Sequence, residues 1–205
     1  PPLAAGFVAG GPRRGRRGWR GWPSLIDIVA WPNGQFAALA TEGQVLVSAD
    51  DGQTWKANQI QTEESPQGIT CDPQNRLWVV GSFSTIIVSG DGGQNWEDHS
   101  IGDDTILTTI QFIDAEHAMI FGEYGFSVYT ADGGQTWTPG TPLPDEFYPQ
   151  DAWFRDLQTG WVAGLAGQIL HTADGGQTWA LQNTGTLAPI YSLAGIGNDV
   201  YAAGG

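Results

Sequence analysis

The sequence Thr130-Ala-Asp132-Gly-Gly134-Gln-Thr-Trp137 decides the fold, because three other segments repeat its pattern without a gap. Each copy has Ser or Thr at the first position, Asp at the third, Gly at the fifth and Trp at the eighth. The copies end at Trp55, Trp96, Trp137 and Trp179, so they step by 41, 41 and 42 residues. A pattern of this length does not recur at a regular spacing by chance. The chain is therefore a repeat protein.

Short apolar runs recur in fixed registers upstream of each box. One register ends 15 residues before each box tryptophan and comprises Phe36–Ala40, Leu77–Gly81, Ala118–Gly122 and Gly160–Gly164, with Val200–Gly204 continuing the series. An earlier register comprises Ile26–Ala30, Ile69–Cys71, Thr109–Ile113, Ala152–Phe154 and Ile190–Ala194. A third run precedes each box, and the box tryptophan is expected to open a fourth. Turn residues such as Pro32-Asn33-Gly34 separate the runs, which is typical of short antiparallel strands.

Four strands per repeat predict an all-β fold, a β-propeller of four-stranded antiparallel blades. The expected blades are 24–62, 65–100, 104–143 and 147–184, with a partial one at 188–205, and no helix longer than two turns is expected among them. An open β-solenoid is the alternative, but hairpin turns in every repeat argue against it. Residues 1–23 form an atypical Arg/Gly-rich segment, read as a degenerate blade, a sequence error or a clasp that closes a five-bladed ring. Because Val200–Gly204 matches a second strand, the chain is expected to be part of a longer protein.

Every position of the box has an expected structural role in the hairpin between the third and fourth strands. The Asp carboxylate and the Ser or Thr hydroxyl accept hydrogen bonds from turn amides, the Gly supplies a positive φ, and the Trp buries apolar surface. The boxes lack the alternating oxygen ligands of a calcium loop, so no metal is expected. The predicted box residues are Ser48, Asp50, Gly52, Trp55, Ser89, Asp91, Gly93, Trp96, Thr130, Asp132, Gly134, Trp137, Thr172, Asp174, Gly176 and Trp179.

The box pattern resembles the Asp-box (BNR) repeats of sialidases, xyloglucanases and sortilin-type receptors. The chain is most similar to the photosystem II stability/assembly factor family. Three features carry this similarity: the sequence Asp-Gly-Gly-Gln-Thr-Trp, the spacing near 41 residues, and strands such as Trp161-Val-Ala-Gly164. The resemblance covers residues 24–205. It implies a seven-bladed, non-enzymatic propeller that helps to assemble a membrane complex. It also implies an extracytoplasmic location, in a periplasm, a thylakoid lumen or outside the cell.

Charge constrains the partner. The formal net charge is −14, and beyond residue 20 only Lys56, Arg76 and Arg155 oppose 22 acidic residues. Such a surface repels nucleic acid and anionic lipid and favours a basic protein segment, such as an extracytoplasmic loop of a membrane complex. Simple solubility, or a halophilic source, explains the charge equally well. The family's photosynthetic members are associated with a basic patch, whereas residues 21–205 of this chain carry three basic residues in all. No uncharged apolar run is long enough to span a membrane, so direct insertion is not expected.

The expected docking face carries the loops between second and third strands and the linkers between blades, opposite the boxes. An acidic and aromatic set of residues lies there: Glu42, Phe83, Glu123, Tyr124, Asp145, Glu146, Phe147 and Tyr148. These loops could dock a basic peptide, or could be an ordinary solvated surface.

Enzymatic alternatives have little support in the sequence. A carbohydrate-binding or glycoside-hydrolase propeller is the second hypothesis, but no carboxylate pair is singled out by its spacing. Sialidase chemistry needs three arginines, and only Arg76 and Arg155 fall within the blades. His99, His117 and His171 occupy unrelated repeat positions with no carboxylate or serine placed to form a relay, so they are expected to be ordinary surface or strand histidines. Cys71 has apolar neighbours and is expected to be a buried small hydrophobe. No cofactor is expected.

Overall fold

The computed structural model of the chain describes residues 24–31, 34–144 and 147–205. These residues form five antiparallel sheets and no regular helix beyond three-residue 3₁₀ turns, so the prediction of an all-β propeller of four-stranded blades is confirmed. The hypotheses about residues 1–23 lie outside the described part of the chain.

Each of the first four sheets is an up-and-down meander of consecutive strands. The first sheet contains β1 (Leu25–Ala30), β2 (Phe36–Ala40), β3 (Gln44–Ser48) and β4 (Lys56–Gln59). The second contains β5 (Pro66–Cys71), β6 (Leu77–Gly81), β7 (Ile86–Ser89) and β8 (Glu97–Asp98). The third contains β9 (Leu107–Phe112), β10 (Ala118–Gly122), β11 (Ser127–Thr130) and β12 (Thr138–Pro139). The fourth contains β13 (Pro149–Phe154), β14 (Gly160–Gly164), β15 (Ile169–Thr172) and β16 (Ala180–Gln182). The fifth contains β17 (Ile190–Ile196) and β18 (Asp199–Gly204).

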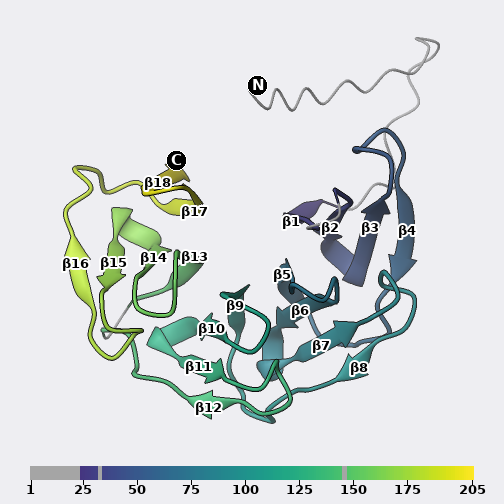
Figure 1. Ribbon diagram of the computed structural model, residues 1–205, viewed down its shortest axis with the longest axis horizontal. Helices are drawn as coiled ribbons and strands as arrows, with labels where there is room; N and C mark the ends of the chain where they lie inside the picture. Colours follow the sequence, from purple (N-terminus) through teal and green to yellow (C-terminus); the bar gives the residue numbers. More distant parts are fainter. Residues whose placement is uncertain (1–23, 32–33, 145–146) are drawn as a thin grey trace.

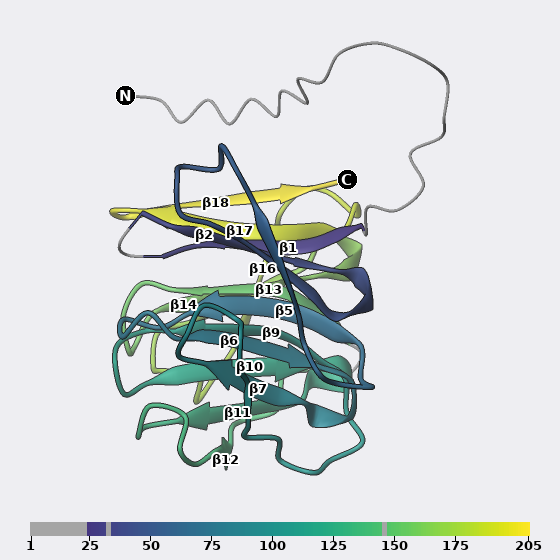
Figure 2. The same cartoon turned by 90° about the vertical axis from the view of Figure 1, so that its right-hand side faces the viewer.

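The sheets follow one another in an arc around a central axis (Figure 1), with neighbouring inner strands β1, β5, β9, β13 and β17 in contact. The turned view in Figure 2 shows strands running across the thickness of the arc, so that hairpins emerge at its two faces. The box hairpins join third to fourth strands on one face. The connections between second and third strands lie on the other, which we call the loop face.

The hydrophobic core lies between successive sheets, as radial stacking requires. One cluster joins the first and second sheets through Leu39, Val45 and Leu77. A second joins the second and third sheets around Trp78, whose side chain is fully buried. A third joins the third and fourth sheets around Phe121. Each sheet therefore depends on its neighbours for burial.

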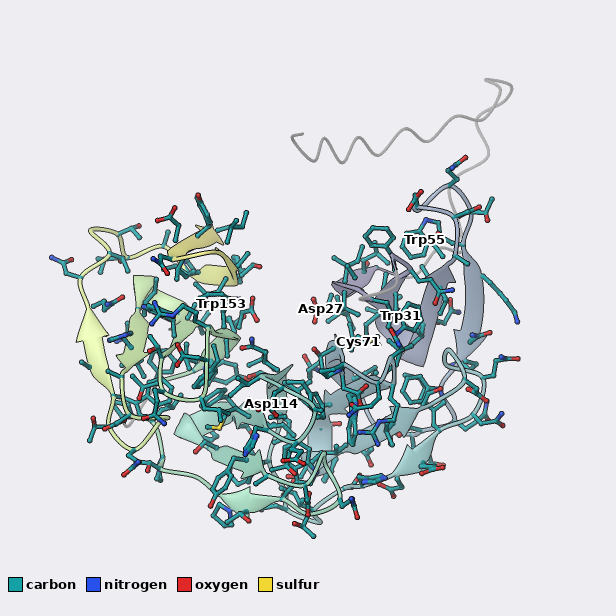
Figure 3. All side chains as sticks on the ribbon, viewed as in Figure 1. Asp27, Trp31, Trp55, Cys71, Asp114 and Trp153 are labelled. Atoms are coloured by element: carbon teal, nitrogen blue, oxygen red, sulfur yellow. The ribbon has the colours of Figure 1, made fainter. Side chains whose placement is uncertain are left out.

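Carboxylates on two inner strands add hydrogen bonds between sheets. The backbone N–H of Ile69 donates to Asp27 Oδ2 at 3.0 Å, and that of Leu193 donates to Asp151 Oδ2 at 2.7 Å. In both cases the carboxylate reaches the inner strand of the next sheet. Burial raises the pKa of Asp27 to about 6, and the negative charge of Asp151 adds to the shift. Figure 3 shows Asp27 at the inner edge of the arc.

Candidate docking site on the loop face

The box carboxylates accept the same hydrogen bonds in all four copies, whereas the box tryptophan donates its indole N–H to the box glycine carbonyl only in the first two. In the third, the Asp132 carboxylate accepts from Thr136 N at 2.9 Å and from the Thr136 hydroxyl at 2.6 Å. The Thr130 hydroxyl donates to Asp132 Oδ1 and accepts from Gly134 N, which has φ +85°. Hydrogen bonds from Thr136, first its hydroxyl, and from Thr130 hold the pKa of Asp132 at about 2. The Asp132 carboxylate thus accepts the hydrogen bonds that the groups of the turn donate.

Replacing Asp132 by alanine is expected to lower the melting temperature, because the turn amide of Thr136 and the hydroxyl of Thr130 lose their acceptor. The contribution of Asp132 should be present above pH 4 and should disappear as the pH falls through about 2, since its folded pKa lies below 3.8. Thermal unfolding of Asp132→Ala, with exposed Asp199→Ala as the control, measures the effect. A variant that kept full stability but lost a binding or catalytic activity would contradict a structural role.

The box tryptophans lie at the junctions between blades. All four are partly buried, and each lies just before the fourth strand rather than opening it, as we had expected it to do. Trp96, Trp137 and Trp179 pack against core clusters that include the preceding sheet. Because each box tryptophan lies beside a short outer strand, the protein covers only one side of its ring. The box tryptophan therefore seals the outer part of the junction with the preceding blade.

Two aromatic side chains stand at the tips of neighbouring loops on the loop face. The connecting turns are η1 (Thr41–Gly43), η2 (Ser82–Ser84), η3 (Glu123–Gly125) and η4 (Leu165–Gly167). Their central residues Glu42, Phe83, Tyr124 and Ala166 all have φ between 51° and 64°. Phe83 is 59% exposed and Tyr124 is 81% exposed. Bulky residues are costly in this left-handed region, yet the repeated turn holds both rings there and leaves them exposed.

A groove of about 310 Å³ begins beside Phe83. Its apolar wall includes Ile87 and the half-buried Trp96, and its acidic wall includes Glu64 and Asp98. Hydrogen bonds from Ser100, first its hydroxyl and then its backbone amide, lower the pKa of Asp98, which keeps this carboxylate ionised at neutral pH. The groove can therefore take one long side chain with an apolar stem and a cationic end.

A second cluster surrounds Tyr124. Burial is the main cause that raises the pKa of Tyr148, and the charges of nearby Glu123 and Tyr124 add to it. These three residues form one patch. Phe147 does not belong to it: this ring is 3% exposed and packs in the core between the third and fourth sheets, so its prediction as a docking residue is wrong. The sequence did not indicate that Phe147 packs in the core, because this residue lies within a proline-rich, acidic linker. Asp145 and Glu146 lie outside the described residues.

Other sequence candidates have local structural partners. Arg76 binds Asp72 at 2.6 Å and the Gly133 carbonyl at 3.0 Å, whereas Arg155 contacts Asp156 at 3.1 Å. Burial, followed by the charge of Asp72, raises the pKa of the half-buried Cys71 thiol to about 12, so it stays protonated at neutral pH.

His117 takes part in a local turn contact. His117 does have a carboxylate partner, with Nδ1 at 2.8 Å from Asp114 Oδ1. Asp114 also accepts the backbone N–H of Glu116 and of His117, so the pair closes the β9–β10 turn. Sequence reasoning missed this pair because its spacing does not recur in the other repeats.

Within the described ranges, no group of three or more His, Cys, Asp or Glu side chains is arranged to hold a metal ion. Nor does that part of the chain contain a helix long and apolar enough to cross a membrane.

Known structures share the fold. A structure of YCF48 bound to D1 peptide superposes with a TM-score of 0.69 at 21% identity, covering 92% of this chain and 63% of that one. YCF48 from Cyanidioschyzon merolae gives 0.58 at 15% identity, covering 89% and 80%. The GH74 xyloglucanase from Xanthomonas campestris gives 0.67 at 12% identity, covering 83% and 33%. The chain thus spans less than two thirds of the length of the first of these proteins.

Sequence comparison distinguishes one family among the proteins that share this fold. No curated protein matches the chain. The profile of the family described as photosynthesis system II assembly factor YCF48 matches residues 63–128 and 99–190, which together cover more than half of the sequence. This chain is therefore a member of the photosynthesis system II assembly factor YCF48 family.

Proposed function

We propose that this chain is a non-enzymatic, extracytoplasmic docking scaffold whose loop face binds an extended basic segment of a protein partner. The observation that carries the proposal is the pair of exposed rings, Phe83 and Tyr124, held in left-handed turns at equivalent positions of adjacent blades. Aromatic anchors of this kind dominate the energy of protein interfaces. A similar fold occurs in a YCF48 protein bound to D1 peptide, which supports peptide docking.

The groove beside Phe83 defines the chemistry of the partner. A lysine or arginine side chain would lay its methylene groups against Ile87 and Trp96 and place its charge between Glu64 and Asp98. The volume of about 310 Å³ suits one side chain, so the rest of the segment would run along the surface. Tyr124, one blade further on, would provide the next contact. Glu123 and the patch with Tyr148 extend the acidic surface in that direction.

A pair of synthetic peptides tests this proposal. We expect an acetylated, amidated decapeptide of alternating Lys and Ala to bind the chain, and its Glu/Ala counterpart not to bind. Phe83→Ala should weaken binding about tenfold, because it removes an anchoring ring. Glu64→Gln and Asp98→Asn should each weaken it several-fold while preserving side-chain shape. Fluorescence polarisation of labelled peptides measures the affinities.

Glu116→Gln is the matched control, since this exposed carboxylate lies in the β9–β10 hairpin, at the opposite end of the strands from the loop face. It should leave the affinity unchanged. Equal binding of the acidic peptide, or equal weakening by Glu116→Gln and Glu64→Gln, would contradict a basic docking groove beside Phe83.

A further inference from the structure

A second groove, of about 570 Å³, opens between the third and fourth blades. It is lined by Met119 and Gly140 of the third blade and by Phe154, Leu157 and the Gly176 turn of the fourth. Its position beside a box hairpin separates it from the loop face.

Two rings fill the equivalent space between the second and third blades. Trp78 lies so close to the box turn that a Cβ added to Gly134 would sit 2.3 Å from its Cη2 atom. His99 packs edge-on against Trp78, with ring centres 5.5 Å apart, and its Nδ1 lies 2.8 Å from the Gly134 carbonyl oxygen. A ring nitrogen thus occupies the hydrogen-bonding position at this box turn.

One repeat later, both rings are missing. Met119 stands where Trp78 stands one repeat earlier, and Gly140 stands where His99 stands. The Gly176 carbonyl, equivalent to that of Gly134, accepts no hydrogen bond from the described residues. The nearby indole N–H of Trp179 is also without an acceptor among them. In the first two boxes the box tryptophan donates to the equivalent carbonyl, with Trp55 Nε1 3.1 Å from the Gly52 oxygen and Trp96 Nε1 3.2 Å from the Gly93 oxygen. Among the residues described at the third junction, neither the box tryptophan nor a ring in the place of His99 donates to the Gly176 carbonyl.

The rim of the groove carries larger apolar side chains than its counterpart. Tyr129 replaces Val88 and is 40% exposed, and Leu157 replaces Ala115 and is 43% exposed. Exposed apolar side chains gathered around a hollow are typical of binding sites. A loss of packing alone would not explain why the rim residues are larger and remain exposed.

We infer that this groove binds an aromatic side chain with a ring N–H donor, tryptophan or histidine, from a polypeptide partner. The ring would lie between Met119, Tyr129 and Leu157, and its N–H would donate to the Gly176 carbonyl, as His99 does to Gly134. The side chains of the second junction show the geometry. This site is independent of the proposed basic-peptide groove and would provide a second contact on another part of the propeller.

The single methionine of the sequence makes the test direct. With ¹³C-methyl methionine labelling, Met119 gives one reporter signal inside the groove. Titration with N-acetyl-tryptophanamide should shift this signal saturably. N-acetyl-phenylalaninamide, which has no ring donor, should bind about three- to tenfold more weakly, because it leaves the carbonyl unpaired.

Variants locate the binding. Tyr129→Ala and Leu157→Ala should each weaken the shift several-fold, whereas Tyr201→Ala, an exposed tyrosine of the fifth sheet, should leave it unchanged. Met119→Trp, which places a ring inside the groove as Trp78 does, should abolish binding in ligand-observed saturation-transfer spectra. No Met119 shift up to 20 mM probe, or a shift insensitive to both rim variants, would overturn the proposal. Equal affinity for the two probes would overturn the hydrogen bond to Gly176.

Discussion

Replacement of Trp78 by alanine is expected to lower the free energy of unfolding by about 3–5 kcal/mol, the cost of a large cavity in a packed core. The Trp78 side chain is fully buried and belongs to the cluster between the second and third sheets. Its indole N–H donates to Asp72 Oδ2 at 2.9 Å, and the same carboxylate binds Arg76. The ring also contacts Phe112 and Trp137. Chemical denaturation of Trp78→Ala measures the loss.

Trp161→Ala provides a matched control for Trp78→Ala. Trp161 occupies the corresponding position of the fourth blade but is only partly buried, where it stacks on Trp153. Its replacement should cost clearly less. If Trp161→Ala cost as much stability as Trp78→Ala, the full burial of Trp78 between the second and third blades would not be the reason for the large loss.

Replacement of Asp27 by asparagine is expected to stabilise the fold at pH 7 by about 1–3 kcal/mol, given a pKa raised to about 6. The folded state holds the Asp27 proton more tightly than the unfolded state does. Unfolding free energy must therefore fall as the pH rises from about 4 to about 6. Asparagine removes the charge and can still accept the hydrogen bond from Ile69 N, but it loses the one that Ile28 N donates to the other carboxylate oxygen, so the gain is smaller than the pKa shift alone implies. Denaturation at several pH values should show a smaller slope in this window for Asp27→Asn.

The control for this slope is Asp199→Asn, because Asp199 is exposed. It should leave the slope between pH 4 and 6 unchanged. If Asp27→Asn were neutral or destabilising at pH 7, the ionised carboxylate of Asp27 would instead be favourable in the folded state.

The period of 41 residues was enough to predict the blades. Four second-strand predictions coincide with the observed strands β2, β6, β10 and β14. They succeed because strand length, turn position and box position are repeated, so each repeat supports the reading of the others. The location of the boxes at the hairpins between third and fourth strands follows from the same register.

The sites depend on what differs between repeats, and the sequence alone was a poor guide there. Glu64 and Asp98 flank Phe83 only because the linker and the fourth strand meet beside it. Phe147 was assigned to the surface from its acidic, proline-rich neighbours, but the linker turns this ring into the core. The second groove could have been noticed by aligning repeats, since Met119 and Gly140 replace two rings. The space that results is visible only when adjacent blades are packed together.

The most direct test of the docking scaffold is the affinity for the Lys/Ala decapeptide across a range of salt concentrations. The distance beyond which exposed charges are screened falls from about 10 Å at 0.1 M salt to about 3 Å at 1 M, so contacts with Glu64 and Asp98 should weaken as salt is added. We expect the dissociation constant to rise about tenfold between roughly 0.05 and 0.5 M salt, and this dependence to be reduced in Glu64→Gln and Asp98→Asn. An affinity that does not change with salt, or a salt dependence that both variants retain in full, would contradict the account.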